Sequence, residues 1–114
     1  MTQESKEQFA ATGQQALQTL VDRIVRLVRP LRIFVFGSAA RGDMGAHSDI
    51  DLLVIMPPGA HRRRTAQRIY TEIQGVGVPF DVLVATADDI EKHKHNVGLI
   101  YATILREGQE VYAA

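Results

Sequence analysis

The sequence predicts an α+β domain in which a small mixed sheet of three or four strands is flanked by helices. Three observations favour this class. Amphipathic helical patterns alternate with short runs of β-branched and aromatic residues, no segment repeats another, and glycine or proline separates most neighbours. The 114 residues suit a single domain spanning 1–114, because a chain of this length buries enough surface to form one core.

The first half of the chain predicts one helix and two strands. Apolar residues follow helical spacing over Ala16–Val28, and Pro30 ends this helix because proline disfavours the helical conformation of the residue before it. The run Leu31–Phe36 is short, β-branched and aromatic, as expected of a strand. Residues 37–49 form a glycine-containing loop, and a second strand covers Ile50–Met56 up to a Pro-Pro-Gly terminator.

The second half predicts a helix, a strand and a further helical region. The helix covers residues 60–74 and should direct Tyr70 inward, and a third strand covers Phe80–Ala85. Thr86 is followed by two aspartates, which is typical of a capped helix start because carboxylates favour the positive end of the helix dipole. The remaining boundaries are an interruption near Asn96–Gly98, a helix end at Gly108 and a short final strand over Glu110–Tyr112.

Composition and charge exclude several classes of function. Lysine plus arginine number 13 and aspartate plus glutamate number 13, so the formal net charge is zero and no polyanion-binding tail is expected. The absence of cysteine excludes disulfides, thiolate zinc sites and thiol nucleophiles. Apolar runs fall far short of the about 18 residues of a transmembrane helix, and the charged N-terminal residues do not form a secretory signal. We expect a cytoplasmic protein that does not interact with a membrane.

Two aspartates at the start of the second predicted strand are candidate metal ligands. Asp49 and Asp51 point to the same side, because side chains alternate along a strand. Two like charges beside an apolar strand are costly unless a positive group lies between them. Magnesium suits this position, since it takes one or two carboxylates together with substrate phosphates. A plain ion pair of Asp51 with Arg32 or Arg41 is the alternative.

A third acid lies within the third predicted strand. If this strand pairs beside the second, Asp81 faces Asp49 and Asp51. Three carboxylates could then hold two metal ions about 3.5–4 Å apart, as in phosphoryl or nucleotidyl transfer. Asp81 would also be placed to accept a proton from an attacking hydroxyl.

The loop after the first predicted strand carries candidate phosphate-binding residues. Gly37 allows a sharp turn and close approach of a ligand to the backbone. Ser38 offers a backbone N–H and a hydroxyl to phosphate oxygens, and Arg41 follows three residues later with a positive fork suited to polyphosphate. The spacing is not that of a P-loop.

Together these residues resemble the signature of the polymerase-β-like nucleotidyltransferases. A Gly-Ser pair, ten intervening residues and an Asp-x-Asp motif are followed by a third acid on the next strand. The chain looks like the stand-alone minimal nucleotidyltransferases of prokaryotes, which share a Gly-Ser-x-x-Arg-Gly form. The resemblance covers roughly Leu31–Ala85 by motif and most of the chain by element order. The matching residues are Gly37, Ser38, Arg41, Gly42, Asp49, Asp51 and Asp81.

The resemblance implies a magnesium-dependent transfer of a nucleoside monophosphate from a nucleoside triphosphate, usually AMP from ATP, with release of pyrophosphate. Small family members often act as antitoxins beside a helical HEPN-domain ribonuclease toxin, to which they add AMP on a tyrosine. The roles that the family assigns are phosphate binding for Gly37 and Ser38, metal binding for Asp49 and Asp51, and metal binding and proton abstraction for Asp81. Arg41 is a further nucleotide-binding candidate.

Two other functions remain open at this level. The further domain of larger family members does not fit in 114 residues, which favours a partner protein. One alternative is therefore an antitoxin that neutralises its partner by occlusion without catalysis, and the other is an adenylyltransferase acting on a small molecule such as an aminoglycoside. The arginine-rich run Arg62–Arg64 is interpreted as a solvated helix face, with contact to RNA, a phosphate or an acidic partner as the less favoured reading.

Overall fold

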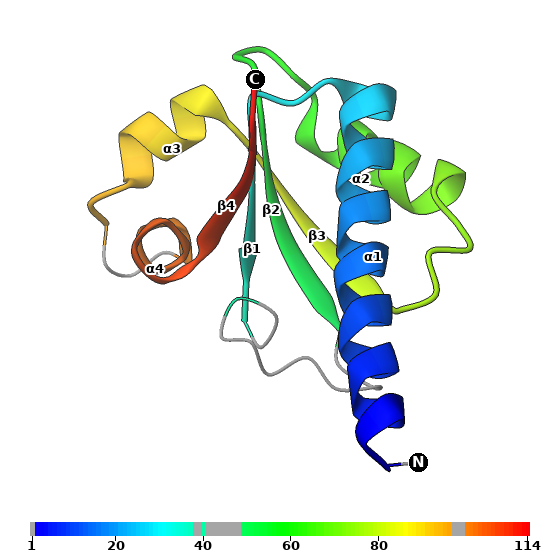
Figure 1. The fold of residues 1–114 in the computed structure, drawn as a ribbon. Coiled ribbons are helices and arrows are strands. Elements are labelled where there is room, and N and C mark those ends of the chain that lie inside the picture. The colour runs from blue at the N-terminus through cyan, green and yellow to red at the C-terminus, as the bar shows by residue number, and fades with distance from the viewer. Residues whose placement is uncertain (1, 38–39, 41–48, 97–99) are drawn as a thin grey trace.

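The computed structural model describes residues 2–37, 40, 49–96 and 100–114, with side chains described from Gly13 onward. Within these ranges the chain folds as the α+β class predicted above (Figure 1). None of the described helices is long and apolar enough to cross a lipid bilayer. The elements are α1 (Thr2–Val28), β1 (Arg32–Phe36), β2 (Ile50–Met56), α2 (Arg62–Glu72), β3 (Phe80–Thr86), α3 (Ala87–His93), α4 (Ile100–Glu107) and β4 (Gln109–Ala113).

Helix α1 is longer than the periodicity indicated. It begins at Thr2, whereas the regular apolar spacing starts only at Ala16. Its end agrees with the prediction: Arg29 adopts a left-handed conformation with φ of 51°, and its N–H still donates to the Val25 carbonyl oxygen at 3.0 Å. Pro30 then prevents a further helical turn, because it has no N–H to donate.

The four strands form one sheet in the order β3-β2-β1-β4. Strand β1 pairs antiparallel with both β2 and β4, and β2 pairs parallel with β3. The predicted pairing of the second and third strands is therefore confirmed. The last strand is an edge strand, like β3 at the opposite side.

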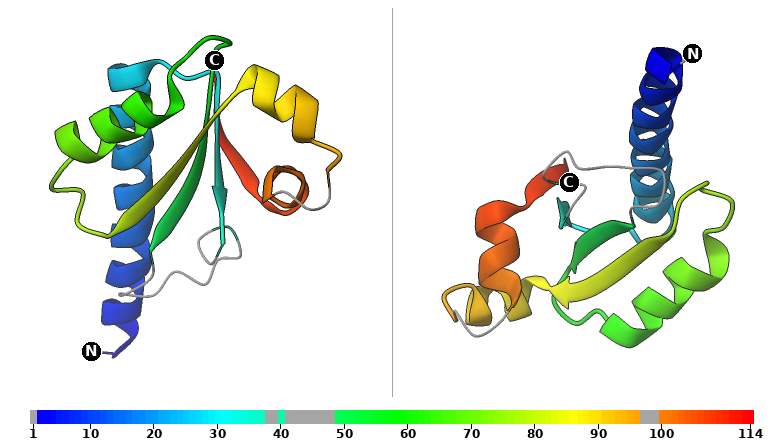
Figure 2. Two further views of the ribbon diagram at one scale, coloured as in Figure 1. Left: turned by 180° about the vertical axis from the view of Figure 1, so that it is seen from behind. Right: turned by 90° about the horizontal axis from the view of Figure 1, so that it is seen from below.

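The sheet lies between two helical layers, as Figures 1 and 2 show from several sides. Helices α1 and α2 cover one face and α3 and α4 cover the other. Alternate residues of β2 supply both cores: Leu52 and Val54 face α1 and α2, whereas Leu53 and Ile55 face α3 and α4. All four are at most 2% exposed, so β2 is the central buried strand of the molecule.

Two sequence predictions in the second half need correction. The predicted helix over residues 60–74 is shorter in the structure, since α2 covers Arg62–Glu72. Tyr70 does not point inward, because its side chain is 44% exposed and its ring stacks on Phe80 at the edge of the sheet. The predicted break in the last helical region is confirmed as separate helices α3 and α4.

Candidate active site

Three aspartates lie at one end of the sheet, where β1 ends and β2 and β3 begin. Asp51 on β2 is the direct register partner of Asp81 on the parallel strand β3. Paired residues of neighbouring strands project from the same face, so both carboxylates project from the face that α3 and α4 cover. Asp49 precedes β2 by one residue and has the same parity as Asp51. The sheet register therefore brings Asp49, Asp51 and Asp81 to this end of the sheet, which we call the acidic edge.

Gly37 allows the chain to pass close to Asp51. It follows β1 directly, and the last residue of that strand, Phe36, is the register partner of Asp51. Gly37 has φ of 70°, and a Cβ built on it would lie 2.6 Å from Asp51 Oδ2. A glycine is therefore required here twice, once for the left-handed backbone and once for the space that the carboxylate occupies.

The three carboxylates interact electrostatically. The pKa of Asp51 is raised, first by partial burial and then by the negative charges of Asp81 and Asp49. Both causes disfavour the charged form of Asp51. A cation bound at this edge would relieve the repulsion, and an ionised Asp51 is the form that could bind it.

The donor chemistry of this edge fits magnesium, although the edge is not a closed metal cage. Among the described residues, no group of three or more histidine, aspartate or glutamate side chains is arranged so as to hold a metal ion. Magnesium needs no such cage, because it retains water and phosphate ligands beside one or two carboxylates. Asp49 and Asp51 are the residues that would hold it, and the role of Asp81 as a third ligand to a pair of metal ions stays a prediction.

The remaining predicted site residues are Ser38 and Arg41. Both lie outside the described residues, so their expected roles in phosphate binding stay predictions. The alternative pairing of Asp51 with Arg32 is wrong, because Arg32 lies at the other end of β1, stacks over the Phe34 ring and pairs with Glu110 on β4.

An apolar cavity of about 590 Å³ adjoins the acidic edge. It lies between the end of β1 and helix α4, and its lining includes Phe36, Gly37, Ile100, Thr103 and Glu107. Its size is in the range of small-molecule sites, and its polar groups are few, as is usual in such sites. Sequence patterns do not predict this cavity, because it depends on how α4 packs against the sheet.

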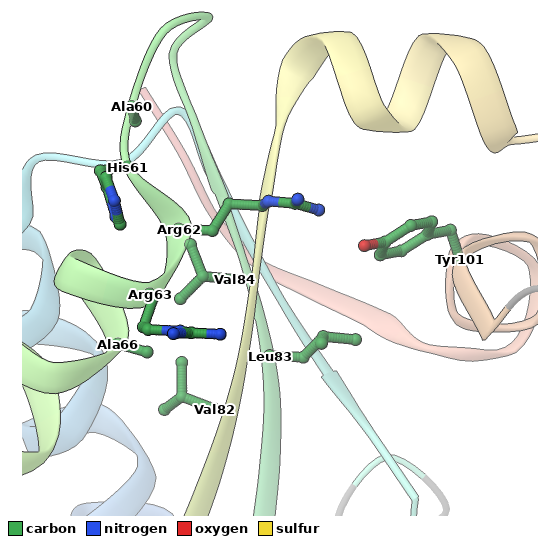
Figure 3. A pocket seen from close by; sticks show the side chains of 9 residues that line it. All are labelled: Ala60, His61, Arg62, Arg63, Ala66, Val82, Leu83, Val84 and Tyr101. Atoms are coloured by element: carbon green, nitrogen blue, oxygen red, sulfur yellow. The ribbon is translucent and has the colours of Figure 1, made fainter.

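A second hollow, which sequence reasoning also missed, lies along the outer edge of β3. Arg62 and Arg63 of α2 and Tyr101 of α4 line it (Figure 3). The sequence pattern predicts a solvated face for the arginine run, and the signal that points to the groove instead is the position of the run at the start of a helix. Three consecutive positive charges there oppose the helix dipole.

Comparisons with known proteins identify the family and the fold of the chain. A family model described as a nucleotidyltransferase domain matches residues 17–110. The crystal structure of a candidate nucleotidyltransferase from Sulfolobus solfataricus is similar to this chain, with a TM-score of 0.51 and 21% sequence identity. The likeness covers 96% of this chain and 85% of that chain, and at this identity it shows a shared fold alone. No curated protein sequence matches the chain significantly.

The family match, together with the mixed sheet between two helical layers, defines a class, that of nucleotide-transferring domains. The chain belongs to the nucleotidyltransferase domain family and is a minimal nucleotidyltransferase. Its activity is accordingly nucleotidyl transfer, for which the substrate is a nucleotide.

Proposed function

We propose that this nucleotidyltransferase uses magnesium to transfer AMP from ATP to a hydroxyl group of a partner protein. We further propose that the partner is a HEPN-type ribonuclease toxin, for which this chain is the antitoxin. The observation that carries the catalytic proposal is the register pairing of Asp51 with Asp81, with Asp49 beside them and Gly37 against Asp51.

The residues of this edge have distinct parts in the proposed reaction. Bound magnesium would neutralise charge on the triphosphate, and Asp49 and Asp51 would hold it. Asp81 is exposed and accepts the proton of the acceptor hydroxyl. The acceptor oxygen then bonds to the α-phosphorus, the bond from that phosphorus to the oxygen bridging the β-phosphate breaks, and pyrophosphate leaves.

The apolar cavity beside Gly37 supports the nucleotide part of the proposal. A nucleoside bound between Phe36 and α4 would have its triphosphate next to the backbone turn at Gly37. Thr103 and Glu107 on α4 supply polar atoms at this cavity, which could contact the base or the ribose.

The test is a transfer assay with ATP labelled at the α-phosphate, magnesium and a purified HEPN-type partner. Asp81→Asn should lower the rate by about 10²–10⁴-fold, the range for loss of a general base. Asp51→Asn should abolish transfer and leave the protein at least as stable, because the substitution removes a charge that its neighbours disfavour. Asp88→Asn, an exposed position in the first turn of α3, is the matched control. Unchanged transfer by Asp51→Asn would overturn the proposed mechanism.

A second candidate function is neutralisation by occlusion alone. The observation that favours it is that the described acids do not form a closed three-ligand site. The two functions separate in cells that express the toxin: under occlusion, Asp51→Asn protects as well as the wild type, whereas under catalysis it does not. Labelling of an antibiotic in place of the protein would favour the small-molecule alternative.

A further inference from the structure

The outer edge of β3 opens into a groove of about 760 Å³, which we call the edge groove. Helix α2 forms one wall and Tyr101 of α4 stands at the other side, with the strand residues Val82, Leu83 and Val84 as the floor (Figure 3). In this view Arg62 extends from α2 across β3 towards Tyr101, and Arg63 lies beside Val82 and Val84. The groove therefore combines an apolar floor with positively charged groups.

The main chain at the floor of the groove has a distinct hydrogen-bonding pattern. Ile50 donates its N–H to the Pro79 carbonyl oxygen at 3.0 Å, which directs the odd-numbered residues of β3 towards β2. The even-numbered residues of β3 therefore direct their N–H and C=O groups outward, and these are Phe80, Val82, Val84 and Thr86.

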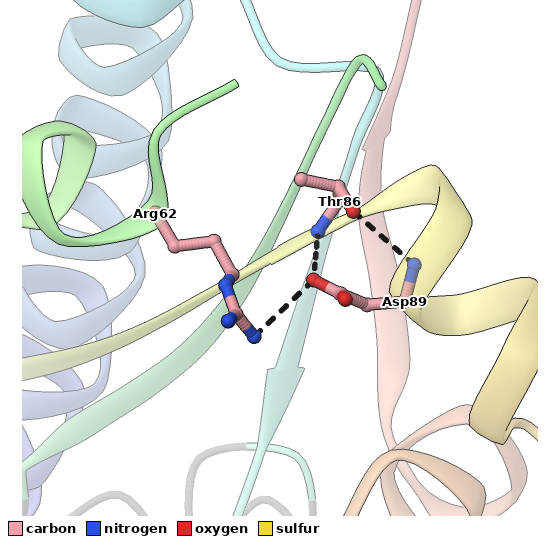
Figure 4. Close-up of polar contacts among 3 residues, drawn as sticks. All are labelled: Arg62, Thr86 and Asp89. Atoms are coloured by element: carbon pink, nitrogen blue, oxygen red, sulfur yellow. Dashed lines mark hydrogen bonds and ion pairs between the residues drawn. The ribbon is translucent and has the colours of Figure 1, made fainter. Parts of the chain in front are cut away.

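Side chains of this protein cap two of the four outward N–H groups. The Val82 N–H donates to Tyr70 Oη at 2.7 Å, and the Thr86 N–H donates to Asp89 Oδ2 at 3.0 Å (Figure 4). No side chain of the described ranges accepts from Val84, which lies between them in the groove. Capping of this kind protects an edge strand against unwanted pairing, so the position at Val84 stands out.

The charge of the groove is concentrated on one wall. Arg62 pairs with Asp89 at 3.4 Å, whereas Arg63 pairs with no carboxylate within the described part of the chain. The first turn of α2 contains no acidic residue, so the positive end of its dipole adds to the arginine charges. This arrangement is locally unfavourable for the helix, and a negatively charged occupant would reverse that cost.

We propose that the edge groove binds an extended, acidic segment of the protein that accepts the nucleotide. The segment adds to β3 as a further strand, pairs with the main chain at Val84 and directs carboxylates to Arg63. This inference rests on the proposed function for its biological meaning, because Asp81 lies on the same strand. Val84 is three residues from Asp81, about 10 Å along the strand, so a segment that pairs at Val84 and leaves the strand before the capped Val82 N–H can still reach the proposed base. Its hydroxyl residue would then meet the acidic edge in a fixed register.

Two other occupants fit the groove less well. A second copy of this chain paired edge to edge would bring Arg62 and Arg63 of both copies together, and like charges at close range repel. A single-stranded RNA would contact the arginines but leave the outward main-chain groups unpaired, and RNA binding relies on aromatic stacking surfaces. The aromatic side chains that line the described part of the groove are Tyr101 and His61, which come from opposite sides of it and do not form a continuous stacking surface.

The test measures binding alone, without ATP or magnesium. The probe is a short fluorescein-labelled peptide of alternating valine and glutamate with a tyrosine at one end, prepared in both orientations, and the readout is fluorescence anisotropy. Arg63→Glu should weaken binding at least about tenfold. Arg64→Glu is the matched control, since Arg64 is the next residue of the same run and does not line the groove. The backbone N–H of residue 64, which donates to His61 Nδ1, is retained in this variant.

Amide hydrogen exchange distinguishes strand addition from general charge attraction. Binding of the peptide should slow exchange of the Val84 N–H most, whereas the already bonded Val82 and Thr86 N–H groups should change less. The proposal is overturned if the acidic peptide does not bind at about 1 mM, a limit that corresponds to very weak affinity. It is also overturned if a valine-lysine peptide or an RNA of equal charge binds more tightly, or if Val84 is already protected in a dimer.

The outcome is separable from the fate of the proposed function. If the peptide binds but no AMP transfer to any protein occurs, the proposed catalytic function fails and the proposal for the edge groove stands. If transfer occurs and Arg63→Glu neither weakens peptide binding nor lowers transfer, the groove proposal fails alone.

Discussion

Gly37 and Asp51 are the residue pair on which the acidic edge depends. The carboxylate of Asp51 occupies the space in which any side chain at position 37 would lie. Because the same carboxylate is also repelled by Asp81 and Asp49, the edge combines tight steric contact with unfavourable charge. Such local conflict is typical of functional sites, where the rest of the fold compensates for the cost.

Gly37→Ala tests the steric part of this pair. We expect a loss in the free energy of unfolding of more than about 2 kcal/mol, since a left-handed alanine and a close contact both contribute. Gly75→Ala is the control, because Gly75 has φ of 73° with nothing within 4 Å of its built Cβ. It should cost only the about 1–2 kcal/mol of the backbone conformation. Equal losses in the two variants, measured by urea unfolding, would show that the contact with Asp51 is unimportant.

A double-mutant cycle refines that result. In an Asp51→Ala background the penalty of Gly37→Ala should fall towards that of Gly75→Ala, because the conflicting oxygen is gone. A penalty that stays unchanged in this background would assign the strain to other atoms.

Asp89 predicts how stability depends on pH. Its pKa is lowered from the ordinary value of 3.8, chiefly because the Thr86 backbone N–H donates to its carboxylate. In return, the Asp89 backbone N–H donates to the Thr86 hydroxyl oxygen at 3.1 Å. A lowered folded-state pKa means that the stabilisation is present above 3.8 and is lost as pH falls through the lower folded value. Asp89→Ala should therefore cost about 1 kcal/mol near neutral pH and progressively less in acid. Denaturant titrations over this pH range measure the effect, and a constant difference between wild type and Asp89→Ala would contradict the assignment.

At the scale of elements, β3 is the strand that carries both proposals. Its first residues bring Asp81 into register with β2, and its outer edge forms the floor of the edge groove. Helix α2 stabilises the strand from one side, since the Tyr70 ring stacks on Phe80 and the Tyr70 hydroxyl accepts a hydrogen bond from the Val82 N–H. Tyr70 is thus exposed for a structural reason, which helical periodicity alone does not reveal.

Tyr70→Phe tests this capping of the edge. The ring stack is retained, so we expect only about 0.5–1 kcal/mol of lost stability, because water can replace the hydroxyl at an exposed edge. The sharper readout is amide exchange, which should accelerate at Val82. Tyr112→Phe on the opposite edge strand is the control, and it should leave exchange at Val82 unchanged.

At the scale of the whole molecule, the two faces of the sheet have cores of unequal size. The face under α1 and α2 contains thirteen buried residues, whereas the face under α3 and α4 contains six among the described residues. The smaller layer includes the α4 wall of the proposed nucleotide cavity. We therefore expect α4 to open more readily than α1, as elements beside ligand sites often do.

Leu20→Ala and Ile104→Ala compare the two layers. Both side chains are buried, at 0% and 2% exposure, so each truncation should destabilise by about 2–5 kcal/mol if the molecule unfolds as one unit. The smaller layer predicts an additional effect for Ile104→Ala: faster amide exchange confined to α3 and α4 under native conditions. Equal acceleration across the whole sheet in this variant would show that the layers are fully coupled.

The sequence by itself determined the α+β class, the strands β1, β2 and β3 and the positions of the acids, because alternation and helical spacing are local properties of the chain. The motif around Gly37, Asp49, Asp51 and Asp81 was sufficient to indicate the family. Only the tertiary structure decided that β3 is an edge strand, that Tyr70 caps it, and that Arg63 lies over the groove. These features depend on which strands become neighbours and on how helices pack across them, and contacts between distant segments leave no periodic signal in the sequence.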